Sequence, residues 1–331
     1  MILHILKVNC LPTVSKHQPS VKLEPVKSAV IQQPSTDLTR GIGAAVLASS
    51  IWGGMYVISR IVLGVIPPIT LVCIRMLVSL LAMFIFLRIR NLEWRLPREI
   101  WTRVLLMGIV GYTISISAQF IGTKLAGAAL GSLITTASPL VTVALSAFLK
   151  LERVNARAWF GLGLGLLGVV LTSTGSSDTN PLGILALIVA AVSWGVLGLI
   201  GGQVVSKHDP MAVTAWASAI GFFGTLIIVP FELISNTIGT ITPGILLGIL
   251  YLGVVSTAIA FAAWVYGVSR AGSVLSGIAF FAQPIVGSLL GFLLLHEQLG
   301  WNFAAAAILL FAGAILARPE PRETRKGYDS A

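Results

Sequence analysis

Long apolar stretches alternate with short polar connections along nearly the whole chain. The apolar stretches are continuous runs and lack the alternating pattern of strands, so they favour helices. At a rise of about 1.5 Å per residue, such runs can cross the roughly 30 Å hydrocarbon core of a bilayer. We therefore predict an all-α integral membrane protein with ten transmembrane helices. The predicted helices cover approximately residues 42–63, 69–87, 104–124, 127–149, 157–174, 182–203, 212–233, 244–267, 273–295 and 301–317.

The apolar runs form two copies of one unit. With an offset of 145 residues, the stretch 126–170 aligns without a gap on the stretch 271–315. Its matched pairs include Gly127 and Gly272, Pro139 and Pro284, Glu152 and Glu297, and Gly168 and Gly313. An offset of 142 matches Trp52-Gly53 with Trp194-Gly195 and Pro68 with Pro210. A doubled hydrophobic unit is typical of secondary transporters built from related halves.

The repeat divides the chain into four parts. They are a tail of residues 1–40, a first repeat of residues 41–174, a second repeat of residues 182–317 and a tail of residues 318–331. The first tail is polar and contains four prolines, so we expect it to be disordered and cytoplasmic. Lys7 interrupts its only short apolar start, so we expect no signal peptide.

The composition and the placement of charge agree with a membrane protein. The chain is 56% hydrophobic and 10% charged, whereas a soluble domain carries about 25% charged residues. The net charge of +10 would favour a nucleic-acid partner in a soluble protein, but here the basic residues gather in alternate connections. If the N-terminus is cytoplasmic, cytoplasmic segments hold 19 of the 22 lysines and arginines. The positive-inside rule then predicts cytoplasmic termini. We expect a plasma membrane, such as a bacterial inner membrane, and no nucleic-acid partner.

The two copies carry their basic connections at different positions. Residues 88–103 contain five arginines, whereas the equivalent residues 230–244 contain none. Five spans per copy is an odd number, so two successive copies enter the membrane in opposite directions. The charge pattern therefore predicts two inverted five-helix repeats.

Polar, small and aromatic side chains recur on single faces of several predicted helices. Ser132, Thr135 and Ser138 follow helical spacing, as do Tyr112, Ser115 and Gln119, whose repeat partners are Thr257, Ala260 and Trp264. Such faces suit a water-accessible cavity between the repeats, or alternatively close helix packing. The cavity candidates are Trp52, Tyr56, Arg75, Tyr112, Ser115, Gln119, Thr135, Ser138, Trp194, Thr257, Trp264, Phe280 and Gln283.

Arg75 is the clearest charged residue inside a predicted span. A central arginine costs about 2.5–3.5 kcal/mol on insertion scales. It is either a counter-charge for an anionic group such as a carboxylate or a structural arginine bound to backbone carbonyls. Pro139 and Pro284 each remove a helix hydrogen bond and produce either a static kink or a pivot. Glu152 and Glu297 close the fourth and ninth spans, where they anchor loops or act as gates.

Motifs for chemistry are missing or misplaced. The letters GxGxxG occur at Gly163–Gly168, but inside an apolar helix and not between a strand and a helix. No phosphate-binding loop motif, serine-nucleophile motif or histidine-rich metal motif occurs, and the two cysteines, Cys10 and Cys73, offer no metal cluster. We therefore expect no cofactor, no metal and no enzyme activity.

The doubled motif set resembles the EamA domains of the drug/metabolite transporter superfamily. The resemblance covers about residues 42–317 and rests on the two Trp-Gly pairs, Arg75 and the repeated Pro, Glu and Gly positions. It implies a ten-helix inverted-repeat fold with a central cavity near the third, fourth, eighth and ninth helices. It also implies movement of small metabolites, often amino acids or drugs, outward in many members. Ala217 stands where the second copy would repeat Arg75, so the copies have specialised.

Three functional hypotheses follow from the sequence. The first is a secondary transporter that exports a small organic solute by alternating access, with the solute and the lipid bilayer as its partners. The second is a membrane-embedded enzyme acting on a lipid or isoprenoid, which would need a convergent catalytic set. The third is a non-transporting membrane sensor that works through its tails.

Overall fold

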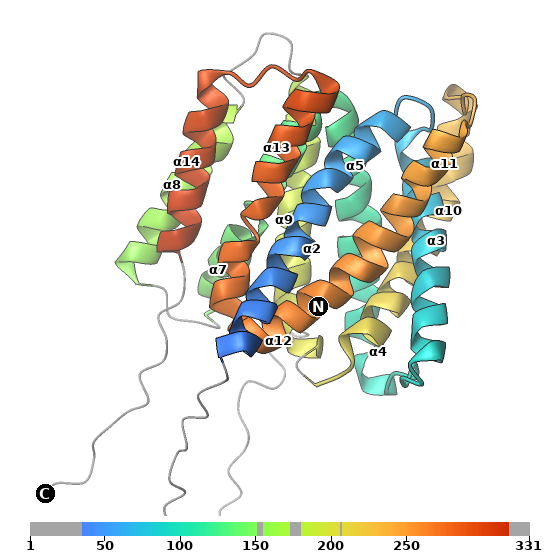
Figure 1. Cartoon of the computed structure of the whole chain (residues 1–331), viewed down its shortest axis with the longest axis horizontal. Coiled ribbons are helices and arrows are strands. Elements are labelled where there is room, and N and C mark those ends of the chain that lie inside the picture. The colour runs from blue at the N-terminus through green and yellow to red at the C-terminus, as the bar shows by residue number, and fades with distance from the viewer. Residues whose placement is uncertain (1–34, 151–154, 173–179, 206, 318–331) are drawn as a thin grey trace, which may run out of the picture.

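The computed structural model describes residues 35–150, 155–172, 180–205 and 207–317, and within these ranges every regular element is a helix (Figure 1). Eight helices are long and apolar enough to cross a membrane, and two shorter apolar helices cover Ala156–Thr172 and Trp301–Leu316. The prediction of an all-helical protein is therefore confirmed for the described residues. The first helix begins at Ser35, so residues 35–40 of the expected tail are helical. Residues 1–34 lie outside the described part.

The first repeat begins with two long helices and continues through several shorter elements. These are α2 (Ser35–Val62), α3 (Pro68–Ile89), η1 (Arg98–Ile100), α4 (Trp101–Leu106), the π-helix η2 (Met107–Ser115), α5 (Ile116–Ala126), α6 (Ala128–Thr135), α7 (Ser138–Phe148) and α8 (Ala156–Thr172). The second repeat has the corresponding order. Its elements are α9 (Pro181–Val205), α10 (Pro210–Ser235), α11 (Pro243–Leu250), the π-helix η3 (Tyr251–Ile259), α12 (Ala260–Ala279), α13 (Ala282–Leu295) and α14 (Trp301–Leu316).

Both repeats bend the chain at the same two places. Gly127 has φ 96° and ψ 169°, and its repeat partner Gly272 has φ 77° and ψ 167°. A positive φ of this size favours glycine because a Cβ atom would be strained there. A second break precedes each of the two prolines at which a kink or pivot is predicted. Helix α6 ends at Thr135 before Pro139, and α12 ends at Ala279 before Pro284. Proline lacks the N–H group that would continue the helix across the break.

The halves pack on each other through matching glycines. A Cβ atom added to Gly53 would lie 2.5 Å from the carbonyl oxygen of Gln283. The counterpart Gly195 would place a Cβ atom 2.9 Å from the carbonyl oxygen of Ser138, and Ser138 is the repeat counterpart of Gln283. Helix α2 therefore contacts α13 in the same way that α9 contacts α7. Small residues at such contacts let helix backbones approach closely in lipid.

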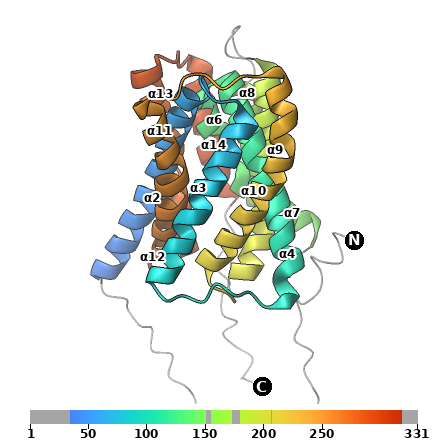
Figure 2. The ribbon, with the colours of Figure 1, turned by 90° about the vertical axis from the view of Figure 1, so that its right-hand side faces the viewer.

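Helices α3 and α10, which are repeat counterparts, run antiparallel side by side (Figure 2). Near the start of α10, the indole Nε1 of Trp216 donates a hydrogen bond of 2.8 Å to the carbonyl of Trp94, beyond the end of α3. Near the end of α10, the carboxylate of Glu232 accepts from the backbone N–H of Ile69, 2.9 Å away at the start of α3. The connections 88–103 and 230–244 therefore lie at opposite ends of this helix pair.

The largest buried cluster joins α2, α3, α9 and α10 with the two π-helices. A smaller cluster joins α6, α7, α8 and α14, where the α8–α14 pair forms one side of the molecule (Figure 1). Outward-facing side chains remain strongly apolar, with Ile227 71% exposed, Phe231 70% and Ile234 80%. Such a surface is compatible with hydrocarbon and not with water.

Replacing Gly53 with alanine tests the close contact between α2 and α13. The added Cβ would overlap the Gln283 carbonyl and the nitrogen of Gly287, and overpacking of this kind costs about 1–3 kcal/mol. We expect Gly53→Ala to lower the thermal unfolding temperature of the detergent-solubilised protein. Gly43→Ala on the same helix is the matched control, because nothing lies within 4 Å of its added Cβ. Equal unfolding temperatures for the two variants would contradict the contact.

Candidate functional site

An aromatic cluster lies where α2 meets α12. The rings of Trp52 and Trp264 have centroids 5.4 Å apart, and Phe280 lies 6.0 Å from Trp52 and 5.7 Å from Trp264. Phe261 completes the cluster, 5.4 Å from Trp52. The Trp52 indole Nε1 also donates a hydrogen bond of 2.9 Å to the carbonyl of Ser256. Three cavity candidates that are distant in sequence thus meet in one place.

A buried polar group lies one helical turn further along α2. The hydroxyls of Tyr56 and Thr135 hydrogen-bond each other, and Thr135 donates to the carbonyl of Gly131 at 2.7 Å. Because the Thr135 proton is used there, Tyr56 is the donor of the pair. The amide Nε2 of Gln283 lies 3.4 Å from Thr135 Oγ1 and 3.2 Å from Thr136 Oγ1. The three helices α2, α6 and α13 therefore meet through side-chain hydrogen bonds.

Arg75 lies beside this group and is only 4% exposed. Its Nε and Nη2 atoms both donate to the hydroxyl of Thr257 at 3.3 Å, and its guanidinium carbon lies 5.3 Å from the ring centre of Phe120. The guanidinium also lies near Tyr56. These hydrogen bonds of the guanidinium thus go to the hydroxyl of Thr257. They do not go to backbone carbonyls, which are the partners named in the interpretation of Arg75 as a structural residue.

The π-helices explain how Thr257 reaches Arg75. Thr257 donates to the carbonyl of Leu252 at 2.9 Å, and in η2 Thr113 donates to the carbonyl of Gly108 at 3.1 Å. Both bonds reach back five residues, as the wider π-turn permits. The structural counterpart of Thr257 is therefore Thr113, one residue away from the Tyr112 that the sequence offset of 145 pairs with it.

Other candidates lie at contacts of α9 with the first repeat. The ring of Tyr112 lies 6.2 Å from that of Trp194, and Ser115 donates to the carbonyl of Ala190 at 2.7 Å. Ser138 packs its backbone against Gly195, while Gln119 is 8% exposed on α5. For Ser115 and Ser138 these contacts are those of helix packing.

Glu297 connects the end of α13 to the start of α6. Its carboxylate oxygens accept hydrogen bonds from the backbone N–H groups of Ala128 and Ala129, at 2.7 and 2.8 Å. The first N–H groups of a helix have no partner within the helix, so a carboxylate stabilises that end. Glu297 thus anchors two broken helices to each other. Its repeat partner Glu152 lies outside the described residues.

Two residues that make contacts between helices, Tyr251 and Glu232, were not identified from the sequence. Tyr251 donates from its hydroxyl to the carbonyl of Ile51 at 2.8 Å and lies near Arg75. The sequence offset of 145 pairs Tyr251 with Leu106, and the register of the π-helices pairs it with Met107. Neither partner is polar, so a comparison of the two copies gives no signal for Tyr251. Glu232 could have been found, because it is the one acidic residue in the stretch 230–244.

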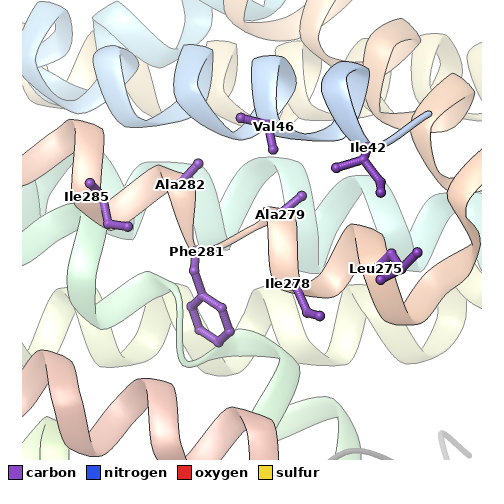
Figure 3. Close-up of a pocket in the computed structure, with 8 residues that line it drawn as sticks. All are labelled: Ile42, Val46, Leu275, Ile278, Ala279, Phe281, Ala282 and Ile285. Carbon is purple, nitrogen blue, oxygen red and sulfur yellow. The ribbon is translucent and has the colours of Figure 1, made fainter. Parts of the chain in front are cut away.

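The central candidates pack against one another in this conformation. One hollow, of about 360 Å³, lies between α2 and the break from α12 to α13, where Ala279 and Ala282 face α2 while Ile278 and Phe281 point away from it (Figure 3). A second hollow, also about 360 Å³, lies at the end of α3 around Trp94. Neither hollow is lined by a cavity candidate. Within the described ranges, no group of three histidine, cysteine, aspartate or glutamate side chains gathers as metal ligands would.

Comparison with known proteins identifies the family. The model of the EamA-like transporter family matches residues 39–174 and again residues 181–318. The chain belongs to this family and carries the EamA domain twice. Together with its apolar helices, this membership makes the chain a multi-pass membrane protein of a transporter family.

Similar proteins are themselves named as transporters. An uncharacterized transporter of Archaeoglobus fulgidus is 28% identical over 82% of this chain and 94% of its own length. A probable amino-acid metabolite efflux pump of Salmonella typhimurium is 27% identical over 81% of this chain and 91% of its own length. A solved crystal structure superposes with a TM-score of 0.58 at 23% identity, covering 86% of this chain and 97% of the other, and shows the same fold.

Replacing Glu297 tests its role as an anchor. Glu297→Ala removes two hydrogen bonds to a charged group, each worth about 1.5–3 kcal/mol. We expect a lower thermal unfolding temperature, with Glu297→Gln intermediate because an amide keeps only one acceptor oxygen. Gln298→Ala is the control, since its exposed side chain follows directly in the chain. An unfolding temperature for Glu297→Ala equal to that of Gln298→Ala would contradict the anchor.

Proposed function

We propose that this protein is a secondary transporter that moves small organic metabolites out of the cell by alternating access. The observation that carries the proposal is the matched packing of two EamA repeats around a buried set of polar and aromatic side chains. The names of the Salmonella typhimurium and Escherichia coli relatives as probable amino-acid metabolite efflux pumps support metabolites as cargo and export as direction.

We propose further that ten helices cross the membrane as two inverted repeats. Eight helices have the required length and composition, and α8 and α14 pack on each other along the same side of the molecule. The antiparallel course of the counterparts α3 and α10 supports the inversion. The placement of 19 of 22 basic residues supports cytoplasmic termini in a plasma membrane.

In this proposal the broken helices open the cavity. Thr135 on α6 and Gln283 on α13 hold the two repeats together at the centre, so access to the cavity requires these hydrogen bonds to separate. The breaks before Pro139 and Pro284 allow each helix to bend on one side of its proline. The aromatic cluster around Trp52 and the polar group around Tyr56 would then line the solute pathway.

Flux measurements test the transport function. The purified protein is reconstituted into proteoliposomes and assayed with labelled succinate, L-leucine, uridine, glucose, choline and spermidine, against protein-free liposomes. We expect protein-dependent flux of at least one solute, and a lower flux for Gln283→Leu, because leucine offers the solute no amide in the opened cavity. Absence of flux for the whole panel, with protein that is folded by circular dichroism, would contradict the proposed function.

Reporter tags test the inverted arrangement. Tags inserted within residues 88–103 and within residues 230–244 should report opposite sides of the membrane, because the two connections lie at opposite ends of α3 and α10. The measurement uses a paired reporter that is active on only one side, with a C-terminal tag as the cytoplasmic reference. Two connections on the same side would rule out inversion.

A further inference from the structure

Arg75 has an unused hydrogen-bonding edge in the centre of the molecule. The side edge of its guanidinium, formed by Nε and Nη2, donates to Thr257. The Thr257 hydroxyl gives its own proton to Leu252, so it acts towards Arg75 as an acceptor. Nη1 is buried and has no hydrogen-bond partner among the described residues. The outer edge, which carries Nη1, therefore has no protein partner at Nη1. Protein atoms enclose this edge in the present conformation, so a ligand reaches it only after the helices separate.

No carboxylate of the described residues forms an ion pair with Arg75. The ion pair found within that part of the chain joins Arg270 to Asp37, and the described acidic residues Glu232 and Glu297 accept from backbone N–H groups at helix ends. A buried cation without a counter-ion is unfavourable in a medium of low polarity. Arg75 thus retains a positive charge for which the described chain provides hydroxyls and an aromatic ring but no negative partner.

Aromatic and hydroxyl-bearing side chains surround Arg75. Tyr56, Tyr112 and Tyr251 lie near the guanidinium. Ser256 is the neighbour of Thr257 in η3, and its carbonyl accepts the hydrogen bond from the Trp52 indole. The aromatic cluster therefore begins next to the arginine. The polar and apolar groups thus lie beside each other.

We infer that Arg75 binds the carboxylate of the transported solute through this outer edge. Two parallel N–H groups of a guanidinium match the two oxygens of a carboxylate in spacing and plane. The cargo would then be an organic acid or a zwitterion whose remaining part contacts the aromatic cluster. The inference rests on the proposed transport function and names the chemical class of its solute. Because Ala217 replaces the arginine in the second repeat, only one such subsite is formed.

The first test compares solute classes in proteoliposomes of wild-type protein, Arg75→Gln, Arg75→Lys and Ser79→Ala. Ser79 is the matched control, because it is buried one turn further along α3 and its hydroxyl has no partner among the described residues. We expect wild-type protein and Ser79→Ala to move succinate or L-leucine in preference to uridine, glucose, choline and spermidine. Arg75→Gln should lose carboxylate flux by about tenfold or more, since it leaves a buried charge without its partner. Arg75→Lys should fall between them, because lysine keeps the charge but not the fork.

The second test uses the wild-type protein alone. Thermal unfolding of the wild-type protein in detergent is followed with benzoate and with benzamide, which has the same shape but no charge. We expect stabilisation by benzoate alone. Equal stabilisation by both compounds, or by neither, would overturn the role of Arg75, as would carboxylate flux of Arg75→Gln equal to that of the wild type. Flux of uncharged or cationic solutes alone would overturn the inference but support the transporter. No flux of any solute would overturn both.

Discussion

The architecture depends on how closely helix backbones approach one another in a medium without water. Lipid tails are as apolar as leucine, so apolar burial does not drive helices together as it does in water. Close packing and hydrogen bonds between helices replace it. The α8–α14 pair shows this directly, because a Cβ atom on Gly161 would lie 2.6 Å from the carbonyl oxygen of Gly313, and one on Gly313 would lie 2.6 Å from that of Gly161. At the centre, a Cβ atom on Gly131 of α6 would lie 2.9 Å from the ring of Tyr56, so the glycine lets Tyr56 of α2 reach Thr135.

The central polar groups are satisfied across elements that are themselves irregular. Thr257 belongs to a π-helix, Thr135 ends a helix, and Gln283 follows a break in the chain. Irregular backbone at membrane depth is tolerated where protein buries it or water reaches it. The same irregularities that direct these side chains inward also leave the helices bendable. The candidate site and the breaks in the helices therefore coincide in this fold.

Much of the fold could be predicted from the sequence, and less of the site. Continuous apolar runs locate the helices, and the doubled Gly127 and Pro139 positions mark the breaks, because glycine and proline act locally on the backbone. The π-turns were not predicted, since they depend on a single extra residue per turn and leave no mark in hydropathy. Nor could the sequence pair Trp52 with Phe280, or Gln283 with Thr136, because such contacts depend on how closely two distant helices approach. Tyr251 was not predicted for a further reason, because an apolar residue stands at the corresponding position of the first copy.

The difference between Arg75 and Ala217 has a consequence for the charge where the two halves meet. Helices α3 and α10, which carry Arg75 and Ala217, pack against each other. Two copies of the first repeat would place two guanidinium groups on this helix pair, where low polarity strengthens the repulsion between like charges. An assembly of two second repeats would contain no cation there. Two unequal copies in one polypeptide therefore place a single cation on the helix pair at which the halves meet.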